Sequence, residues 1–260
     1  MKNSVLKEKL DQHYLAYRQK FSSKDPVWIL HRFNDEKDIE IAGLLTAAYA
    51  YGSVDQINRF INSLLETCSN KPYEFTINFQ KRKDKKYLHR LNYRFNTEDD
   101  LADLLFSIST ALKTNGSLKE LFMKQVRKED ISVLNALSGF VSKLNSAIKI
   151  SRGKYYHYLL SNPARGSTCK RMNLFLRWMV REDDIDTGVW NEIGTSKLIM
   201  PVDTHIARIS KKLGLVKRKS IDLKFAIELT EKLRIFDPDD PVKYDFALCH
   251  IGIDKKDFWE

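Results

Sequence analysis

The chain has 260 residues, of which 43% are hydrophobic, and this composition excludes a globally disordered chain. Gly and Pro are sparse, at 10 and 6 residues, which disfavours a β architecture with many turns. A net charge of +10, from 44 Lys and Arg against 34 Asp and Glu, favours a polyanionic partner, nucleic acid first.

The three cysteines, Cys68, Cys169 and Cys249, are too scattered for a disulfide framework and match no zinc or iron–sulfur spacing. The N-terminal residues mix charged and apolar side chains at helical spacing and lack the apolar centre of a signal peptide. No apolar run reaches the length of a membrane span. We therefore expect a soluble, cytoplasmic, monomeric protein without a metal, cofactor or iron–sulfur cluster.

Helical periodicity dominates the N-terminal half of the chain. It predicts helices over 3–21, from 27 onward, over an Ala-rich and buried 37–51, and over 54–67. Residues 80–90 form a basic run on a loop or helix edge. A helix over 97–113 follows, with Thr97 as its cap and acidic residues in its first turn.

The C-terminal half is predicted to be helical as well. Residues 116–146 hold two helices that separate near 129–130, and 150–169 are irregular. Further helices are expected over 169–181, 186–193, 204–213, 221–235 and 241–250, with Asp240 capping the last and Pro241 at its first position. Because no β alternation and no linker interrupts the pattern, the sequence predicts an all-α fold in which 1–260 form one unit.

Asp203 begins a helical pattern and is predicted to be its N-cap. Ile206, Ile209 and Leu213 mark the apolar face, and Gly214 marks the stop. The helix dipole favours the ionised carboxylate at this position. An ionised Asp that faces a Lys can stabilise a cationic transition state, whereas the simpler interpretation is that Asp203 only caps its helix.

Lys170 is the candidate partner, on the first turn of the predicted helix over 169–181. It lies off the apolar stripe of that helix, which consists of Met172, Phe175, Leu176 and Met179. Trp178 is expected in the core. A Lys at the positive end of a helix dipole is unusual, and an ordinary solvated Lys is the alternative.

Residues 201–215 (PVDTHIARISKKLGL) resemble the segment that carries the catalytic Asp in the helix-hairpin-helix DNA glycosylases, the endonuclease III superfamily. The nearest pattern is that of the archaeal 8-oxoguanine DNA glycosylases, and similar bacterial chains form a family without an assigned function. The resemblance is strong over about 163–253. It implies two helical lobes with a cleft between them, and removal of a damaged base, first of all 8-oxoguanine, from double-stranded DNA.

The resemblance also implies the roles of the two candidate residues. Lys170 would attack the anomeric carbon through a Schiff base and act as a β-elimination lyase, while Asp203 would be the acid/base and charge stabiliser. The attack needs a neutral amine, so the pKa of Lys170 must fall through desolvation or through cationic neighbours such as Arg165 and Arg171. The damaged base must leave the duplex stack to reach the pair.

The hairpin departs from the pattern of the superfamily. The usual Leu-Pro-Gly-Val-Gly-x-Lys is replaced by residues 162–170 (NPARGSTCK), with one glycine and a loop two residues longer. We expect phosphate contacts from Arg165, Gly166, Ser167, Thr168 and His205. The change leaves open the substrate preference and whether the hairpin holds a metal ion, and the four-Cys cluster of many relatives is missing.

A base pocket is the remaining element of a glycosylase site. Its candidates are Tyr49, Tyr51, Gln56, Asp245 and Phe246, the last two by resemblance to archaeal relatives; packing is the alternative for the tyrosines. Arg208 is expected to pair with a local carboxylate. The basic runs 80–90 and 211–219 are expected to meet DNA phosphates, unless they are merely solvated faces.

Two other classes of function stay open at this point. A catalytically inactive DNA- or RNA-binding helical protein would keep the basic surface without the chemistry. A general helical interaction protein would also explain the amphipathic helices. The lesion and the base opposite it are not determined by the sequence.

Overall fold

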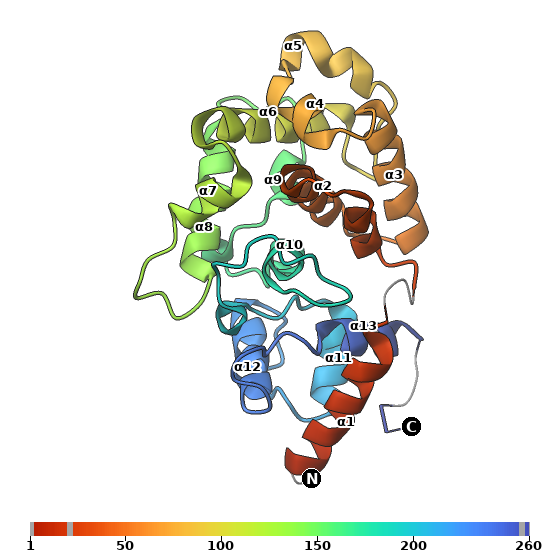
Figure 1. Ribbon diagram of the computed structural model, residues 1–260, viewed down its shortest axis with the longest axis vertical. Coiled ribbons are helices and arrows are strands. Elements are labelled where there is room, and N and C mark those ends of the chain that lie inside the picture. Colours follow the sequence, from red (N-terminus) through yellow and green to blue (C-terminus); the bar gives the residue numbers. More distant parts are fainter. Residues whose placement is uncertain (1–2, 20–22, 255–257, 260) are drawn as a thin grey trace. The chain divides into compact units, whose positions relative to one another are not determined.

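The computed structural model describes residues 3–19, 23–254 and 258–259, and it is built from helices (Figure 1). Within these residues the only β pairing is in two isolated bridges, Tyr93 with Asn96 and Glu182 with Thr187. The predicted all-α fold is therefore confirmed. In the same part of the chain, no helix is both long and apolar enough to cross a membrane.

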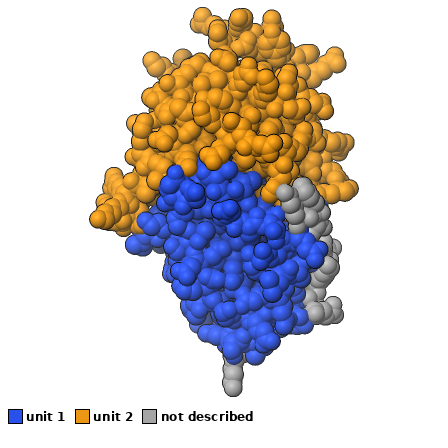
Figure 2. Space-filling model, viewed as in Figure 1, with its two compact units in different colours: residues 1–23, 131–133, 163–260 blue, residues 24–130, 134–162 orange. Residues whose placement is uncertain are grey.

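The chain divides into two compact units, which Figure 2 colours separately. Unit 1 consists of residues 1–23, 131–133 and 163–260, and unit 2 of residues 24–130 and 134–162. The chain thus begins in unit 1, forms unit 2 and returns to complete unit 1.

Unit 2 is organised around a buried central helix, α2, in which every residue from Ile39 to Ala48 is buried. This helix packs against the first 3₁₀ helix, η1, and against α4 and α7. The prediction of a buried Ala-rich helix is confirmed. The helices of unit 2 are η1 (Pro26–Arg32), α2 (Glu36–Ala48), α3 (Val54–Thr67), α4 (Pro72–Asn78), α5 (Lys81–Asp84), η2 (Lys85–Leu88), α6 (Glu98–Asn115), α7 (Leu118–Met123), α8 (Leu134–Ser146) and α9 (Tyr156–Leu159).

The longest helix of unit 2, α6, begins with a capping box. The backbone N–H of Thr97 donates to Asp100 Oδ2 at 2.8 Å, and in return the Thr97 side chain accepts a hydrogen bond from the backbone N–H of Asp100. The predicted cap at Thr97 is confirmed. Asp100 is fully buried, and its carboxylate also accepts a hydrogen bond from the backbone N–H of Tyr155.

Unit 1 places its C-terminal helix α13 against both α1 and α11 (Figure 1). Trp178 has no exposed surface, so its predicted place in the core is confirmed. The helices of unit 1 are α1 (Asn3–Tyr17), η3 (Pro163–Arg165), α10 (Lys170–Val180), η4 (Thr195–Lys197), α11 (Thr204–Lys212), α12 (Leu223–Arg234) and α13 (Asp245–Asp254).

The predicted helix over 186–193 is wrong. The Asp183 carboxylate accepts the N–H groups of Ile185 and Asp186, both at 2.9 Å, and so bends the chain there. Gly188 then adopts a φ of +63°, which a helix does not allow. The helix predicted over 3–21 ends at Tyr17, with residues 20 and 21 outside the described residues.

The start of the last helix also differs from the prediction. Residues 241–244 form a turn, and α13 begins at Asp245 instead of Pro241. Asp240 does not cap it, because its carboxylate accepts from Arg181 Nε at 2.9 Å. A long-range ion pair has therefore replaced the expected local cap.

Candidate functional site

The structure brings Lys170 and Asp203 together within unit 1. Lys170 is the first residue of α10, and Asp203 is the residue that precedes α11. The distance from Lys170 Nζ to Asp203 Oδ2 is 3.0 Å, and the two side chains are 31% and 17% exposed. They form a partly shielded ion pair.

Asp203 is held in place by the helix that it caps. Its Oδ1 accepts from the backbone N–H of Ile206 at 2.9 Å, so the predicted N-cap is confirmed. Ile206 and Ile209 are buried on the inner face of α11, and Gly214 follows the helix with a φ of +70°. One carboxylate oxygen therefore serves the helix, while the other faces the Lys170 amine.

Lys170 is positioned by a tight entry into α10. Cys169 is buried and adopts a left-handed backbone with a φ of +50°. Asn173 Nδ2 donates to the Thr168 carbonyl at 2.9 Å and so ties the first turn to the preceding loop. The predicted apolar stripe is confirmed, since Met172, Phe175, Leu176 and Met179 have no exposed surface. Lys170 is thereby left on the accessible side.

The electrostatics of the pair favour the charged forms of both groups. Burial acts to lower the pKa of Lys170, but the charge and hydrogen bond of Asp203, together with the charges of Cys249 and Asp245, outweigh it, and the pKa lies above its usual value. Burial likewise acts to raise the pKa of Asp203, yet the Lys170 charge and the Ile206 N–H hold it below its usual value. The lowered Lys pKa that a nucleophile needs is thus absent from this resting arrangement.

A buried acid, Asp245, lies next to the pair. Burial raises its pKa to about 6, with the nearby charge of Asp203 adding to the effect. Arg177 Nη1 forms an ion pair with its Oδ2. Phe246 is also buried, with the Arg177 guanidinium 5.9 Å from its ring centre. Both residues are packed into unit 1 here, and their contact with a damaged base stays a prediction.

The sequence analysis missed the charged network to which Asp245 belongs. Arg177 Nη2 lies 3.1 Å from Asp186 Oδ1, and Arg181 pairs with Asp186 as well as with Asp183 and Asp240. Two arginines four residues apart, followed by the acidic run at 182–186, were the available signal. These pairs hold α10 against the start of α13.

The hairpin candidates lie at the end of η3 and in the loop that connects it to α10. Arg165, Gly166 and Ser167 are exposed, and Gly166 has a φ of +76°. The Gly166 carbonyl accepts from Leu223 N at 2.9 Å, which ties the loop to α12. Thr168 is half-buried and is engaged through its carbonyl with Asn173. Phosphate binding by these residues stays a prediction.

His205 and Arg208 both reach α13 at Gly252. Arg208 Nη2 donates to the Gly252 carbonyl at 2.7 Å, and His205 Nδ1 lies 3.2 Å from the same oxygen. A Cβ on Gly252 would meet His205 Cβ at 3.0 Å, so the two helices approach closely here. The predicted phosphate role of His205 and the carboxylate pairing of Arg208 stay predictions.

The other base-pocket candidates belong to unit 2. Tyr49 is buried, with its ring centre 4.5 Å from that of Phe60, which is a packing position. Tyr51 is half-buried, and its hydroxyl donates to Asn96 Oδ1. Gln56 is exposed on the first turn of α3.

Local carboxylates neutralise part of each basic run. In unit 2, Lys81 pairs with the buried Asp103, and Lys85 Nζ lies 2.8 Å from Asp99 Oδ1. In unit 1, Arg218 pairs with Asp222, whereas Lys211 Nζ keeps its charge and donates to the uncharged Lys219 carbonyl at 2.7 Å.

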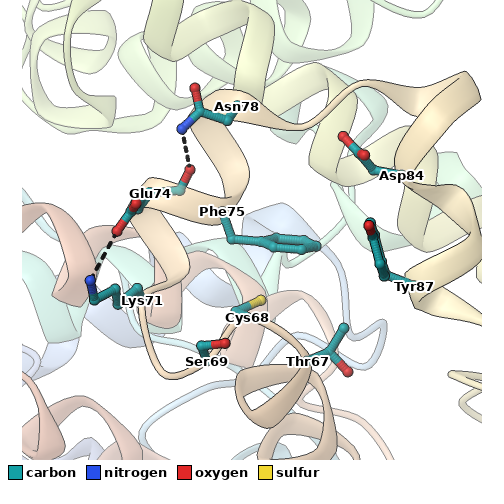
Figure 3. A pocket seen from close by; sticks show the side chains of 9 residues that line it. All are labelled: Thr67, Cys68, Ser69, Lys71, Glu74, Phe75, Asn78, Asp84 and Tyr87. Atoms are coloured by element: carbon teal, nitrogen blue, oxygen red, sulfur yellow. Dashed lines mark hydrogen bonds and ion pairs between the residues drawn. The ribbon is translucent and has the colours of Figure 1, made fainter.

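A separate pocket of about 460 Å³ lies in unit 2 (Figure 3). Burial raises the pKa of the Cys68 thiol to about 12, so the thiol is not a ready nucleophile. Lys71 Nζ lies 3.3 Å from Glu74 Oε2, which neutralises the cation at the rim. The pocket contains neither Lys170 nor Asp203 and is lined by Thr67, Cys68, Ser69, Lys71, Glu74, Phe75, Asn78, Asp84 and Tyr87.

Comparison with known proteins places the chain in a family. Residues 25–254 match the family model DUF2400, described as a protein of unknown function, and the chain belongs to this family. No curated protein and no solved structure matches the chain. The matched range includes Lys170, Asp203 and Asp245.

In the described part of the chain, no group of three or more His, Cys, Asp or Glu side chains is arranged to hold a metal ion.

Proposed function

We propose that this protein is a DNA glycosylase with lyase activity, which removes a damaged base from double-stranded DNA, first of all an oxidised purine such as 8-oxoguanine. The observation that carries the proposal is the 3.0 Å approach of Lys170 Nζ to Asp203 Oδ2, at the starts of two helices. The resemblance of residues 201–215 to the catalytic segment of helix-hairpin-helix glycosylases supports the assignment of roles.

In the proposed reaction, the neutral amine of Lys170 attacks C1′ of the damaged nucleotide. The C1′–N bond breaks, its electron pair leaves with the base, and the base takes up a proton. The Lys170 nitrogen loses a proton as the sugar ring opens, which gives a Schiff base. β-Elimination then removes a proton from C2′, forms the C2′–C3′ double bond and breaks the C3′–O bond, so that the 3′ phosphate leaves. Asp203 stabilises the positive charge that develops on the sugar and transfers protons.

The resting ion pair sets a condition on this mechanism. Asp203 holds Lys170 protonated, so substrate binding has to lower the pKa of the amine before the attack. When the sugar approaches Asp203, the positive charge that develops on the sugar becomes a second partner of the carboxylate. The bound sugar also excludes water from the Lys170 amine. Both changes weaken the preference for the ammonium form.

Borohydride trapping tests the role of Lys170. Incubation with a duplex that contains 8-oxoguanine should give a covalent protein–DNA adduct, because borohydride reduces the Schiff base. Lys170→Gln should abolish the adduct and keep DNA binding. The matched control is Lys232→Gln, which removes the charge of an exposed lysine on α12 and should leave the adduct unchanged. Full adduct formation by Lys170→Gln would refute the assignment.

Asp203→Asn tests the second role. Asn caps a helix about as well as Asp, so the fold should persist, while base release should fall by on the order of 100-fold or more. Asp35→Asn is the control, because Asp35 also caps a helix, accepting from Lys37 N at 2.9 Å, but has no Lys170 beside it. If Asp203→Asn unfolds the protein and Lys170→Gln is fully active, the pair is structural.

The alternative is a nucleic-acid-binding protein without chemistry. The raised pKa of Lys170 favours it, since a stable ion pair can simply hold the start of α10 against that of α11. Failure of the wild type on every lesion-containing duplex, combined with salt-dependent DNA binding, is the result that this alternative predicts.

A further inference from the structure

Unit 2 carries a cluster of four aromatic side chains, three exposed and one half-buried, which we call the aromatic platform: Phe95, Tyr155, Tyr158 and the half-buried Tyr51. Phe95, Tyr155 and Tyr158 are 40%, 38% and 44% exposed. Phe95 lies at the centre, with ring centres of the other three at 5.4 Å, 5.0 Å and 4.9 Å. Leaving contiguous aromatic surface in water is unfavourable, and such patches mark interaction sites.

The platform is built rigidly. Asn96 is buried and bonds to two parts of it: its Oδ1 accepts from the Tyr51 hydroxyl, and its Nδ2 donates to the Tyr155 carbonyl at 3.3 Å. Tyr93 and Asn96 exchange backbone hydrogen bonds of 2.9 Å across a tight turn that presents Arg94 and Phe95. Arg94 has a φ of +55° in this turn, a strained conformation for a residue with a side chain.

Cations adjoin the platform. The Arg94 guanidinium lies 5.8 Å from the centre of the Tyr51 ring, and Lys154 Nζ lies 5.3 Å from that of Tyr155. The two segments that supply most of the platform are rich in Lys and Arg. Residues 80–96 contain seven Lys or Arg and one acidic residue, Asp84, and residues 149–158 contain three Lys or Arg and no acidic residue.

We propose that the aromatic platform binds unpaired bases of single-stranded nucleic acid. Aromatic side chains stack on any base, while adjacent Lys and Arg contact the phosphates, and this combination is what sequence-tolerant single-strand binding needs. The cationic border argues for a nucleic acid occupant rather than an apolar protein surface. The proposal shares its class of partner, Tyr51 and the basic run 80–90 with the proposed glycosylase function, but it requires neither Lys170 nor Asp203.

Fluorescence anisotropy with the full-length protein tests the platform. The probes are a labelled dT 12-mer and an abasic 12-mer with the same phosphates but no bases. The wild type should bind the dT 12-mer more tightly. Phe95→Ala and Tyr158→Ala should each weaken dT binding by roughly fivefold to hundredfold, as for the loss of one base stack, and should leave abasic binding unchanged.

Three controls make the result decisive. Phe95→Tyr should restore dT binding, because the ring is kept. Tyr87→Ala removes an exposed ring from the same basic segment, outside the platform, and should not change dT binding. Lys170→Gln should bind dT normally, because the platform does not include Lys170. Failure of the borohydride experiment would therefore leave this proposal unaffected. Equal wild-type affinity for the dT and abasic 12-mers would overturn it, and so would unchanged dT binding by both folded Ala variants.

Discussion

Asp203 shows how one residue can satisfy a helix and a chemical requirement at once. Its Oδ1 is occupied by the Ile206 N–H, so only Oδ2 is left to face Lys170. The cap fixes the carboxylate without engaging the oxygen that the amine uses. The local pattern in the sequence predicted this cap, since the residue type and the following apolar period are both local signals.

The partner of Asp203 could be predicted only by resemblance. Lys170 stands on the first turn of another helix, and no local pattern brings the two together. The ionisation of the pair was harder still, because the pKa of Lys170 depends on the balance between burial and the charge of Asp203. That balance belongs to the folded unit and to no single segment.

Asp245 carries a prediction about pH. Its pKa is raised to about 6 in the folded protein, so the folded state binds this proton more tightly than the unfolded chain, and stability falls as the pH rises through about 6. Asp245→Asn removes this loss. Urea unfolding at pH 5 and pH 7.5 should show the wild type losing about 1 kcal/mol relative to Asp245→Asn over that interval.

The contrary result for Asp245 is equally clear. If the difference in free energy of unfolding between the two proteins stays constant across this interval, the pKa of Asp245 is not raised. A constant difference is also what a pKa lowered by the charges of Arg177 and Lys170 would give, because Asp245 would then be ionised in both the folded and the unfolded state over this interval.

At the scale of elements, the sequence predicted helices where their signals are local. The buried helix α2, the amphipathic helix α3 and the capped helix α6 follow from periodicity and capping residues. The helix prediction failed at 186–193, where Asp183 bends the chain. It also failed at the start of α13, because the Asp240 carboxylate binds Arg181 instead of capping the helix. Both failures occur where a carboxylate serves a partner that periodicity does not consider.

The segment that carries Tyr155 is held by carboxylates of α6. Asp100 Oδ1 accepts from Tyr155 N at 2.8 Å, and Asp103 Oδ2 accepts from the Ser151 hydroxyl at 2.7 Å. Gly153 passes so close to α6 that a Cβ there would lie 2.6 Å from Asp100 Cα and 2.7 Å from Asp100 N. Backbone atoms of a buried helix turn cannot move aside as a side chain can.

Gly153→Ala should therefore destabilise the protein by about 1–3 kcal/mol, as for overpacking of a close contact. Gly139→Ala in α8 is the control, because its Cβ would meet the flexible Gln125 side chain and Ala favours a helix. Urea unfolding should show Gly139→Ala close to the wild type. A Gly153→Ala variant as stable as Gly139→Ala would mean that the loop has room that the structure does not show.

At the scale of the whole molecule, the net charge of +10 predicts salt-dependent binding to nucleic acid. Local ion pairs reduce this positive charge in places but do not cancel it. Duplex affinity should fall with salt by about 0.9 log units per log unit of salt for each phosphate neutralised. A footprint of about five phosphates thus gives a slope of about −4.5. Anisotropy titrations over a range of NaCl concentrations measure it.

The slope separates a nucleic acid partner from a merely basic surface when a second polyanion is included. Polyglutamate offers charge without bases or regularly spaced phosphates, so it should compete poorly with duplex at equal charge concentration. Lys170→Gln should change the slope by about 1 or less, because one charge contributes at most one phosphate contact. A slope near zero, or equal competition by polyglutamate, would point to a different partner, because phosphate contacts release counterions whenever they form.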